Sequence, residues 1–149
     1  MDAAAIAAGG LLGTPRGPSP VWKLGWAARG RAINEEYGDP TFPDNYPVID
    51  KNPNGVATSV KSIDLNAKTY QNEASLTYRL NQYVADVREF EGDDWGGTNI
   101  READIDSRAV QVIVPEGSLN DANQSVFDKV RARAVKDTKR PVNIIVTEH

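Results

Sequence analysis

The sequence predicts a mixed α/β fold in which helices flank a central sheet. Segments of helical periodicity alternate with short runs that have the composition of strands, which is typical of this fold class. The run at residues 109–114 is rich in β-branched residues and is followed by Pro115 and Gly117. A helical segment separates it from a similar run at residues 142–147, so we expect two parallel strands joined by a crossover helix.

Length and composition indicate one folded domain. The chain has 149 residues, of which 40% are hydrophobic and 26% charged, ordinary values for a globular protein. No run approaches the ~20 apolar residues of a membrane-spanning helix, so no such segment is predicted. Residues 1–18 are rich in alanine, glycine and proline, and we expect a linker remnant of a larger protein there. Residues 19–149 then form the domain.

The remaining elements follow from local signals. We expect helices over residues 20–37, 69–90 and 120–140, strands over residues 46–50, 56–65, 109–114 and 142–147, and a loop over residues 93–97. Ser19 before Pro20 is a typical helix start, and Gly38 a typical helix end. The Asn54-Gly55 pair is a strong turn signal between the first two strands.

The first helix is expected to bury one stripe of side chains. At ~100° per residue, this stripe contains Val21, Leu24, Ala28, Ala32 and Glu35. Trp22 and Trp26 lie on an adjacent stripe and are also expected in the core. A carboxylate at the end of an apolar stripe is notable, because buried carboxylates are paired or bind a cation. Glu36 is the alternative inward carboxylate.

The chemistry open to this chain is limited by two residue types. Cysteine is absent, which excludes disulfides and cysteine-ligated zinc. The single histidine is the last residue, His149, so catalytic triads and two-histidine mechanisms are not expected. Catalysis must therefore use carboxylates, lysine and hydroxyls, with or without a hard metal ion.

The net charge of −4 is unevenly distributed. Residues 86–121 carry ten acidic and three basic side chains, whereas the rest of the chain carries 11 acidic and 14 basic ones. The acidic block is interpreted either as a solvated face or as a surface that faces away from a polyanion or toward a basic partner. The basic side chains of residues 129–140 form either a solvated helix face or an RNA-binding surface.

Four residues can form a site for phosphodiester hydrolysis. Asp50 ends the strand at residues 46–50, and Ser59 and Lys61 share one face of the next strand. Glu35 ends the preceding helix and is expected to reach the same place. Two carboxylates can hold Mg²⁺, and a lysine can neutralise charge that develops on phosphate oxygens. The alternative is structural: a turn aspartate, a strand lysine with an extended stem and a helix-end glutamate.

The run GVATSVKSIDL at residues 55–65, followed by NAKTYQN at residues 66–72, resembles the nuclease toxin domains of CdiA-type contact-dependent growth inhibition proteins. The resemblance covers about residues 24–115 and is most specific around Ser59 and Lys61. It implies the PD-(D/E)xK nuclease fold with a core αβββαβ order. Ser59 departs from the acidic residue in the superfamily pattern, which puts in doubt how strongly that position binds metal.

The resemblance also implies a site and partners. Glu35, Asp50, Ser59 and Lys61 would be catalytic, and Glu35 and Asp50 would bind a divalent ion, with Mg²⁺ favoured and Zn²⁺ or Mn²⁺ as alternatives. Nucleic acid would be bound by a separate group of residues: Lys68, Thr69, Arg29 and Arg31. The implied substrate is tRNA, with DNA as the alternative. The domain would be released from a cell-surface protein, act in the cytoplasm of a neighbouring bacterium and be neutralised by a cognate immunity protein. A non-catalytic binding module is the alternative from a different class.

Overall fold

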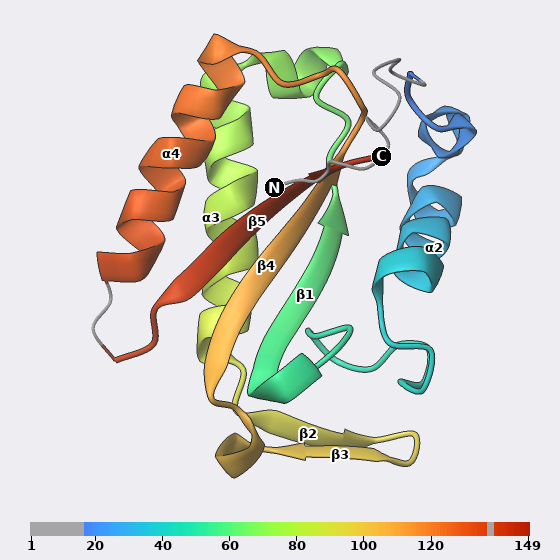
Figure 1. Cartoon of the computed structure of the whole chain (residues 1–149), viewed down its shortest axis with the longest axis vertical. Helices are drawn as coiled ribbons and strands as arrows, with labels where there is room; N and C mark the ends of the chain where they lie inside the picture. The colour runs from blue at the N-terminus through green and yellow to red at the C-terminus, as the bar shows by residue number, and fades with distance from the viewer. Residues whose placement is uncertain (1–16, 137–138) are drawn as a thin grey trace.

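The central sheet has three parallel strands in the order β1-β4-β5. The computed structural model describes residues 17–136 and 139–149, so most of the expected linker at residues 1–18 lies outside the described residues. The strands are β1 (Val56–Ser62), β4 (Ser107–Val114) and β5 (Val142–Glu148). Helices α3 (Glu73–Glu89) and α4 (Asp121–Lys136) cover one face, and α2 (Trp26–Tyr37) packs against β1 on the other (Figure 1). The predicted α/β fold and the parallel crossover pair are confirmed.

The shorter elements connect these layers. They are η2 (Pro20–Lys23), η3 (Pro53–Gly55), η4 (Lys68–Gln71), β2 (Gly92–Trp95), β3 (Thr98–Arg101) and η5 (Glu102–Asp104). In the expected loop at residues 93–97, residues 93–95 instead belong to β2, and residues 96–97 form the turn of an antiparallel β2–β3 hairpin. Gly96 and Gly97 both have positive φ, 60° and 90°, as a two-residue turn between twisted strands requires. No helix within the described residues is long and apolar enough to span a membrane.

The alternation of side chains along β1 gives each face of the sheet its own core. Ser59 and Lys61 are in register with Val110 and Val112 of β4, which belong to the large core under α3 and α4. Val60 belongs to a second core with residues from η2 and α2. Residues 59 and 61 of β1 therefore point toward α3, and residue 60 points toward α2.

The first helix differs from the prediction. Leu24 and Gly25 break it into η2 and α2, so the helical count cannot be carried from Val21 through the break. Leu24 is 45% exposed and Trp26 is 82% exposed, and neither joins the core. Ile33 is instead the buried residue of α2. The predicted cap at Ser19 and the helix end at Gly38 are confirmed.

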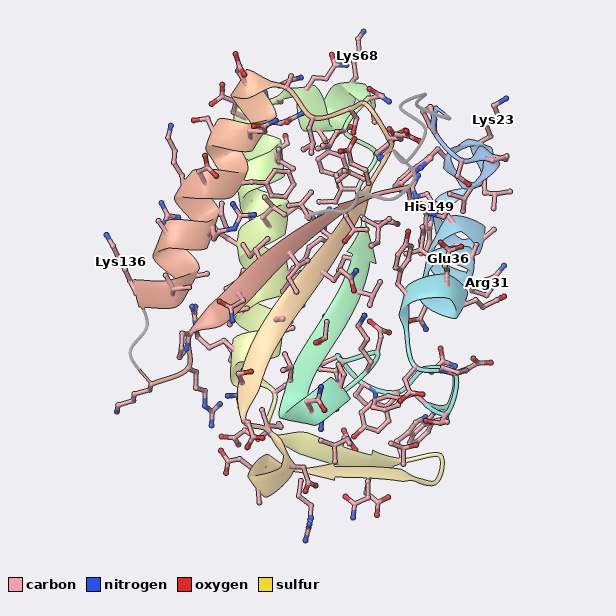
Figure 2. All side chains as sticks on the ribbon, viewed as in Figure 1. Lys23, Arg31, Glu36, Lys68, Lys136 and His149 are labelled. Carbon is pink, nitrogen blue, oxygen red and sulfur yellow. The ribbon has the colours of Figure 1, made fainter. Side chains whose placement is uncertain are left out.

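Helix α2 and η2 are attached to the sheet through His149. Its carbonyl accepts a hydrogen bond from Trp22 Nε1 at 2.8 Å, and its N–H donates to the carbonyl of Val114 at 2.9 Å. Its Nδ1 lies 2.8 Å from the Tyr37 hydroxyl and 3.1 Å from Glu36 Oε2. His149 therefore connects both ends of the α2 region to the end of β5 (Figure 2).

Tyr37 provides a test of this attachment. Burial and the neighbouring Glu36 carboxylate raise the pKa of Tyr37 to about 12. In the unfolded chain this hydroxyl ionises near pH 10. The contribution of Tyr37 to the free energy of unfolding should thus be lost as the pH rises from about 10 to about 12. In urea denaturation, we expect the stability difference between the wild type and Tyr37→Phe to shrink over this range. A difference independent of pH would contradict the proposed environment of Tyr37.

Candidate active site

β1 is an edge strand, and an irregular segment that contains Asp50 lies along its outer side. A strand is predicted over residues 46–50, but only one antiparallel bridge forms, between Lys51 and Thr58. The N–H groups of Asp50 and Lys51 both donate to the carbonyl of Thr58, at 2.8 and 3.3 Å. This bridge is the antiparallel part of an otherwise parallel sheet, and the turn predicted at Asn54-Gly55 leads from it into β1.

A tight turn immediately before Asp50 prevents a regular strand. The N–H of Ile49 donates to the carbonyl of Pro47 at 2.7 Å, and Val48 between them has φ 64°. Pro47 lacks an N–H for a strand ladder. A β-branched residue at positive φ is a strained conformation, and such strain is concentrated at functional sites. The strained turn directly before Asp50 therefore supports a functional role for this segment.

The Asp50 carboxylate takes the place of a backbone partner on the edge of β1. Its Oδ2 accepts a hydrogen bond from the N–H of Val60 at 2.7 Å. Burial raises the pKa of Asp50, while the Val60 N–H and the positive charges of Lys61 and Lys51 lower it, with burial the stronger effect. Asp50 is thus a desolvated carboxylate placed in the field of two lysines, a common arrangement at active sites.

Ser59 and Lys61 lie next to Asp50 on the α3 side of β1. Ser59 is 1% exposed, and its Oγ has no hydrogen-bond partner among the described residues. Buried hydroxyls are almost always hydrogen-bonded, so this hydroxyl indicates a place for a water or a ligand. The Lys61 ammonium lies over the ring of Tyr83, 5.4 Å from its centroid. The structure therefore brings together Asp50, Ser59 and Lys61 of the predicted set.

Lys51 is a site residue that the sequence analysis did not identify. Its Nζ donates to Gln111 Oε1 at 2.7 Å on the α2 side of the sheet. Burial lowers the pKa of Lys51, and the Asp50 carboxylate opposes this effect. Asp50 consequently has one lysine toward each face of the sheet. The adjacency of Lys51 to Asp50 was the only signal in the sequence, and it is not specific.

The structure does not bring Glu35 to this site. Glu35 is exposed and follows the buried Ile33 by two residues, which places it on the opposite side of α2 from the sheet. The buried stripe expected to end at Glu35 is therefore not formed. Glu36 lies closer to the sheet side, but its carboxylate contacts His149. A catalytic role for Glu35 stays a prediction.

The predicted nucleic-acid contacts are dispersed. Arg29 reaches β1, where its Nε donates to Ser62 Oγ at 3.3 Å. Arg31 is exposed and projects away from the sheet, and Lys68 is exposed in η4, at the end of the molecule toward which β1 runs (Figures 1 and 2). Thr69 is also exposed in η4. Only Arg29 is placed beside the strand that carries Ser59 and Lys61.

The donor atoms of the site fit a hard cation that is bound together with a substrate. No group of three or more histidine, cysteine, aspartate or glutamate side chains that could hold a metal occurs within residues 17–136 and 139–149. Asp50 supplies one carboxylate, and Ser59 supplies a hydroxyl without a partner. Mg²⁺ commonly binds through one or two carboxylates, waters and substrate phosphates. A Zn²⁺ site with nitrogen and sulfur ligands does not fit these residues.

Comparisons with known proteins agree with this architecture. The chain matches the model of the CDI toxin restriction endonuclease-like domain over residues 29–147. No curated protein matches it. It is similar in structure to a chain of the CdiA-CT/CdiI toxin and immunity complex from Yersinia pseudotuberculosis. The TM-score is 0.60 and the identity 17%, and the match covers 85% of this chain and 99% of that chain. At this identity the likeness shows the fold.

The parallel sheet with helices on both faces is consistent with a restriction endonuclease-like toxin fold. The chain belongs to the family of CDI toxin restriction endonuclease-like domains, since the family match covers most of its length. This confirms the predicted relationship to CdiA-type toxins. The tRNA-cleaving branch and the PD-(D/E)xK assignment remain predictions.

The strain at Val48 can be measured. Val48 is 39% exposed and has φ 64°, so glycine should relieve the strain with little loss of burial. Such conformations cost about 1–3 kcal/mol, and the added flexibility of glycine costs about 0.5–1 kcal/mol. We expect Val48→Gly to raise the free energy of urea unfolding by about 1 kcal/mol. Val135→Gly, at an exposed valine in α4, should lower it by a similar amount. Destabilisation by both substitutions would contradict strain at Val48.

The ionised Asp50 side chain is expected to lower the free energy of unfolding of the domain. Because its pKa is raised in the folded state, ionised Asp50 destabilises the fold at neutral pH. An asparagine side chain at this position keeps an oxygen that can accept the Val60 N–H. We expect Asp50→Asn to be more stable than the wild type at pH 7, and this difference to shrink as the pH falls and Asp50 becomes protonated.

Asp39→Asn is the matched control, because hydrogen bonds from Thr41 lower the pKa of Asp39. This substitution should reduce stability at pH 7, and the difference should again shrink in acid. A lower stability of Asp50→Asn at pH 7 would show that the two lysines outweigh burial.

Proposed function

We propose that this domain is a metal-dependent endonuclease toxin that cleaves tRNA in a neighbouring bacterial cell. One observation carries the proposal: the Asp50 carboxylate is held at the edge of β1 in the field of Lys51 and Lys61, beside the unpartnered Ser59 hydroxyl. A carboxylate, a hydroxyl and a lysine on one strand edge are the groups that phosphodiester hydrolysis requires. The family of the chain supports the same class of reaction.

Each residue has a separate task in this proposal. Asp50 is anchored by the Val60 N–H, so its free oxygen can face a bound cation and its attached water. Lys61 stabilises the negative charge that develops on the phosphate oxygens during attack. Lys51 favours the ionised form of Asp50 from the other face of the sheet. The Ser59 hydroxyl donates a hydrogen bond to a water or a phosphate oxygen beside Asp50.

Asp50 and Ser59 are the residues that would hold Mg²⁺, with waters and the substrate phosphate completing its ligands. When bound, Mg²⁺ would polarise the phosphate and lower the pKa of a bound water. The sequence analysis predicts Glu35 as a further metal ligand. Because Glu35 is exposed on α2, its role is tested separately from that of Asp50.

The toxin context extends the proposal to partners. The similar structure contains a toxin and an immunity protein, and we propose that a cognate immunity protein neutralises this domain in the producing cell. Delivery from a cell-surface protein would bring the domain into the cytoplasm of the target. The resemblance of residues 61–71 to tRNA-cleaving toxins favours tRNA over DNA.

Substitution of Asp50 or Lys61 should abolish activity. We expect Asp50→Ala and Lys61→Ala each to reduce cleavage at least about 100-fold and to make expression harmless in a host without the immunity protein. Circular dichroism would verify the fold. Glu35→Ala should reduce cleavage only if this exposed residue takes part. Full toxicity of both the Asp50 and Lys61 variants would place the site elsewhere.

The substrate and the metal can be tested with the same purified proteins. The domain is incubated with total tRNA and with supercoiled plasmid, each with Mg²⁺, Mn²⁺, Zn²⁺ or EDTA. We expect tRNA fragments with Mg²⁺ and none with EDTA. A nicked plasmid with intact tRNA would reassign the substrate to DNA. No cleavage of either substrate, together with harmless expression of the wild type, would favour a non-catalytic binding module.

A further inference from the structure

Three basic side chains from three different elements lie around the edge of β1 that faces Tyr83 of α3 and Trp22 of η2. The Lys61 ammonium lies over the Tyr83 ring. Burial raises the pKa of the Tyr83 hydroxyl, and the positive charges of Arg79 on α3 and Arg29 on α2 act on it in the opposite direction, more weakly. Lys61 and Arg79 therefore lie beside Tyr83 on the α3 side of β1, and Arg29 reaches the same strand at Ser62 from the α2 side. We call these three basic residues the β1-edge basic cluster.

The direct contacts of the β1-edge basic cluster are with neutral groups. Arg29 Nε donates to Ser62 Oγ, and its guanidinium lies 5.4 Å from the centroid of the Trp22 ring. Arg79 Nε donates to the Tyr70 hydroxyl at 3.3 Å, and its Nη1 donates to Gln82 Oε1 at 3.0 Å. Among the described residues, none of the three cations forms an ion pair with a carboxylate.

Three other arginines of the chain are neutralised by carboxylates. Arg101, Arg131 and Arg140 each pair with at least one carboxylate, at distances of up to 3.3 Å. Like charges repel when they are gathered without counter-charges, and the repulsion is greater where side chains are partly buried. The contacts of Arg29 and Arg79 orient their guanidinium groups without a counter-charge, which indicates an anionic ligand.

The position of the cluster relates it to the proposed catalytic residues. Lys61 belongs to the cluster and also contributes to the field at Asp50. The acidic residues of the β2–β3 hairpin, by contrast, lie at the other end of the sheet (Figure 1). A polyanion that reaches Asp50 would thus meet positive charge on the α3 side and avoid the acidic hairpin.

We infer that Arg29 and Arg79 bind backbone phosphates of the nucleic-acid substrate next to the phosphate that is cleaved, and this inference rests on the proposed nuclease function. Tyr83 is a positioning residue. Its ring holds the Lys61 ammonium by a cation–π contact, which orients the lysine without neutralising it as a carboxylate would. The ligand is the sugar–phosphate backbone, so these contacts carry no sequence specificity.

The salt dependence of binding tests this inference. The inactive Asp50→Asn protein is titrated with a fluorescent tRNA, and with a labelled DNA duplex, at several salt concentrations. Each phosphate contact contributes about 0.7–0.9 to the slope of log K against log salt. Arg79→Gln and Arg29→Gln should each lower the slope by about this amount and weaken binding several-fold at about 50 mM salt. Arg101→Gln, at an exposed arginine of β3 that is paired with Asp104, is the matched control and should change neither quantity.

Tyr83 is tested through cleavage rather than binding. In the Asp50-containing protein, Tyr83→Leu should lower the cleavage rate about tenfold, and Tyr83→Phe should restore it because the ring is retained. Equal loss in both variants would overturn the positioning role.

The outcomes separate this inference from the proposed function. If the wild type cleaves nucleic acid but Arg79→Gln and Arg29→Gln behave like Arg101→Gln, the phosphate site is wrong and the nuclease function stands. If the wild type neither binds nor cleaves nucleic acid, both fail. Thermal unfolding of each variant verifies that the fold is retained. If Arg29→Gln destabilises α2, the result with Arg79→Gln alone decides whether the phosphate site is correct.

Discussion

The free edge of β1 is the constraint on which the site depends. An edge strand exposes unpaired N–H and carbonyl groups that must be satisfied. Here the segment before β1 satisfies them without forming a strand: two backbone N–H groups bond to the Thr58 carbonyl, and the Asp50 side chain accepts the Val60 N–H. A regular neighbouring strand would bond through its backbone instead. The irregularity therefore places a carboxylate at the strand edge, beside Ser59 and Lys61.

Several features of this edge are unfavourable for stability. Asp50 is an ionisable group that burial makes harder to ionise, Ser59 has a buried hydroxyl without a partner, and Val48 has a positive φ. Each is a departure from what packing and hydrogen bonding favour, and all three occur within one short stretch of the fold. Natural proteins retain such departures mainly where function requires them. Their coincidence is a physical reason, independent of the family, to place the active site here.

The parts of this arrangement that could be predicted from sequence are local or follow from strand alternation. The Asn54-Gly55 turn brings Asp50 back to β1, and alternation puts Ser59 and Lys61 on one face. The prediction that Glu35 ends a buried stripe was wrong. It depended on a helical period counted across Leu24 and Gly25, where the helix is broken. The grouping of Arg79 and Tyr83 with Lys61 depends on how α3 packs against β1, and no periodicity within α3 contains that information.

The arginines of the chain differ in whether carboxylates neutralise them, and this difference follows the uneven distribution of acidic residues along the chain. Where the acidic block supplies carboxylates, as at Arg140 with Glu91 and Glu102, positive charge is neutralised within the fold. At the β1 edge the partners of Arg29 and Arg79 are hydroxyl, amide and aromatic groups, which fix a guanidinium without cancelling its charge. A protein of net charge −4 can therefore present a positive surface to a nucleic acid, because local pairing rather than total charge determines the potential near a site. The same distribution leaves the acidic hairpin at the opposite end of the sheet, where its negative charge repels a polyanionic substrate (Figure 1).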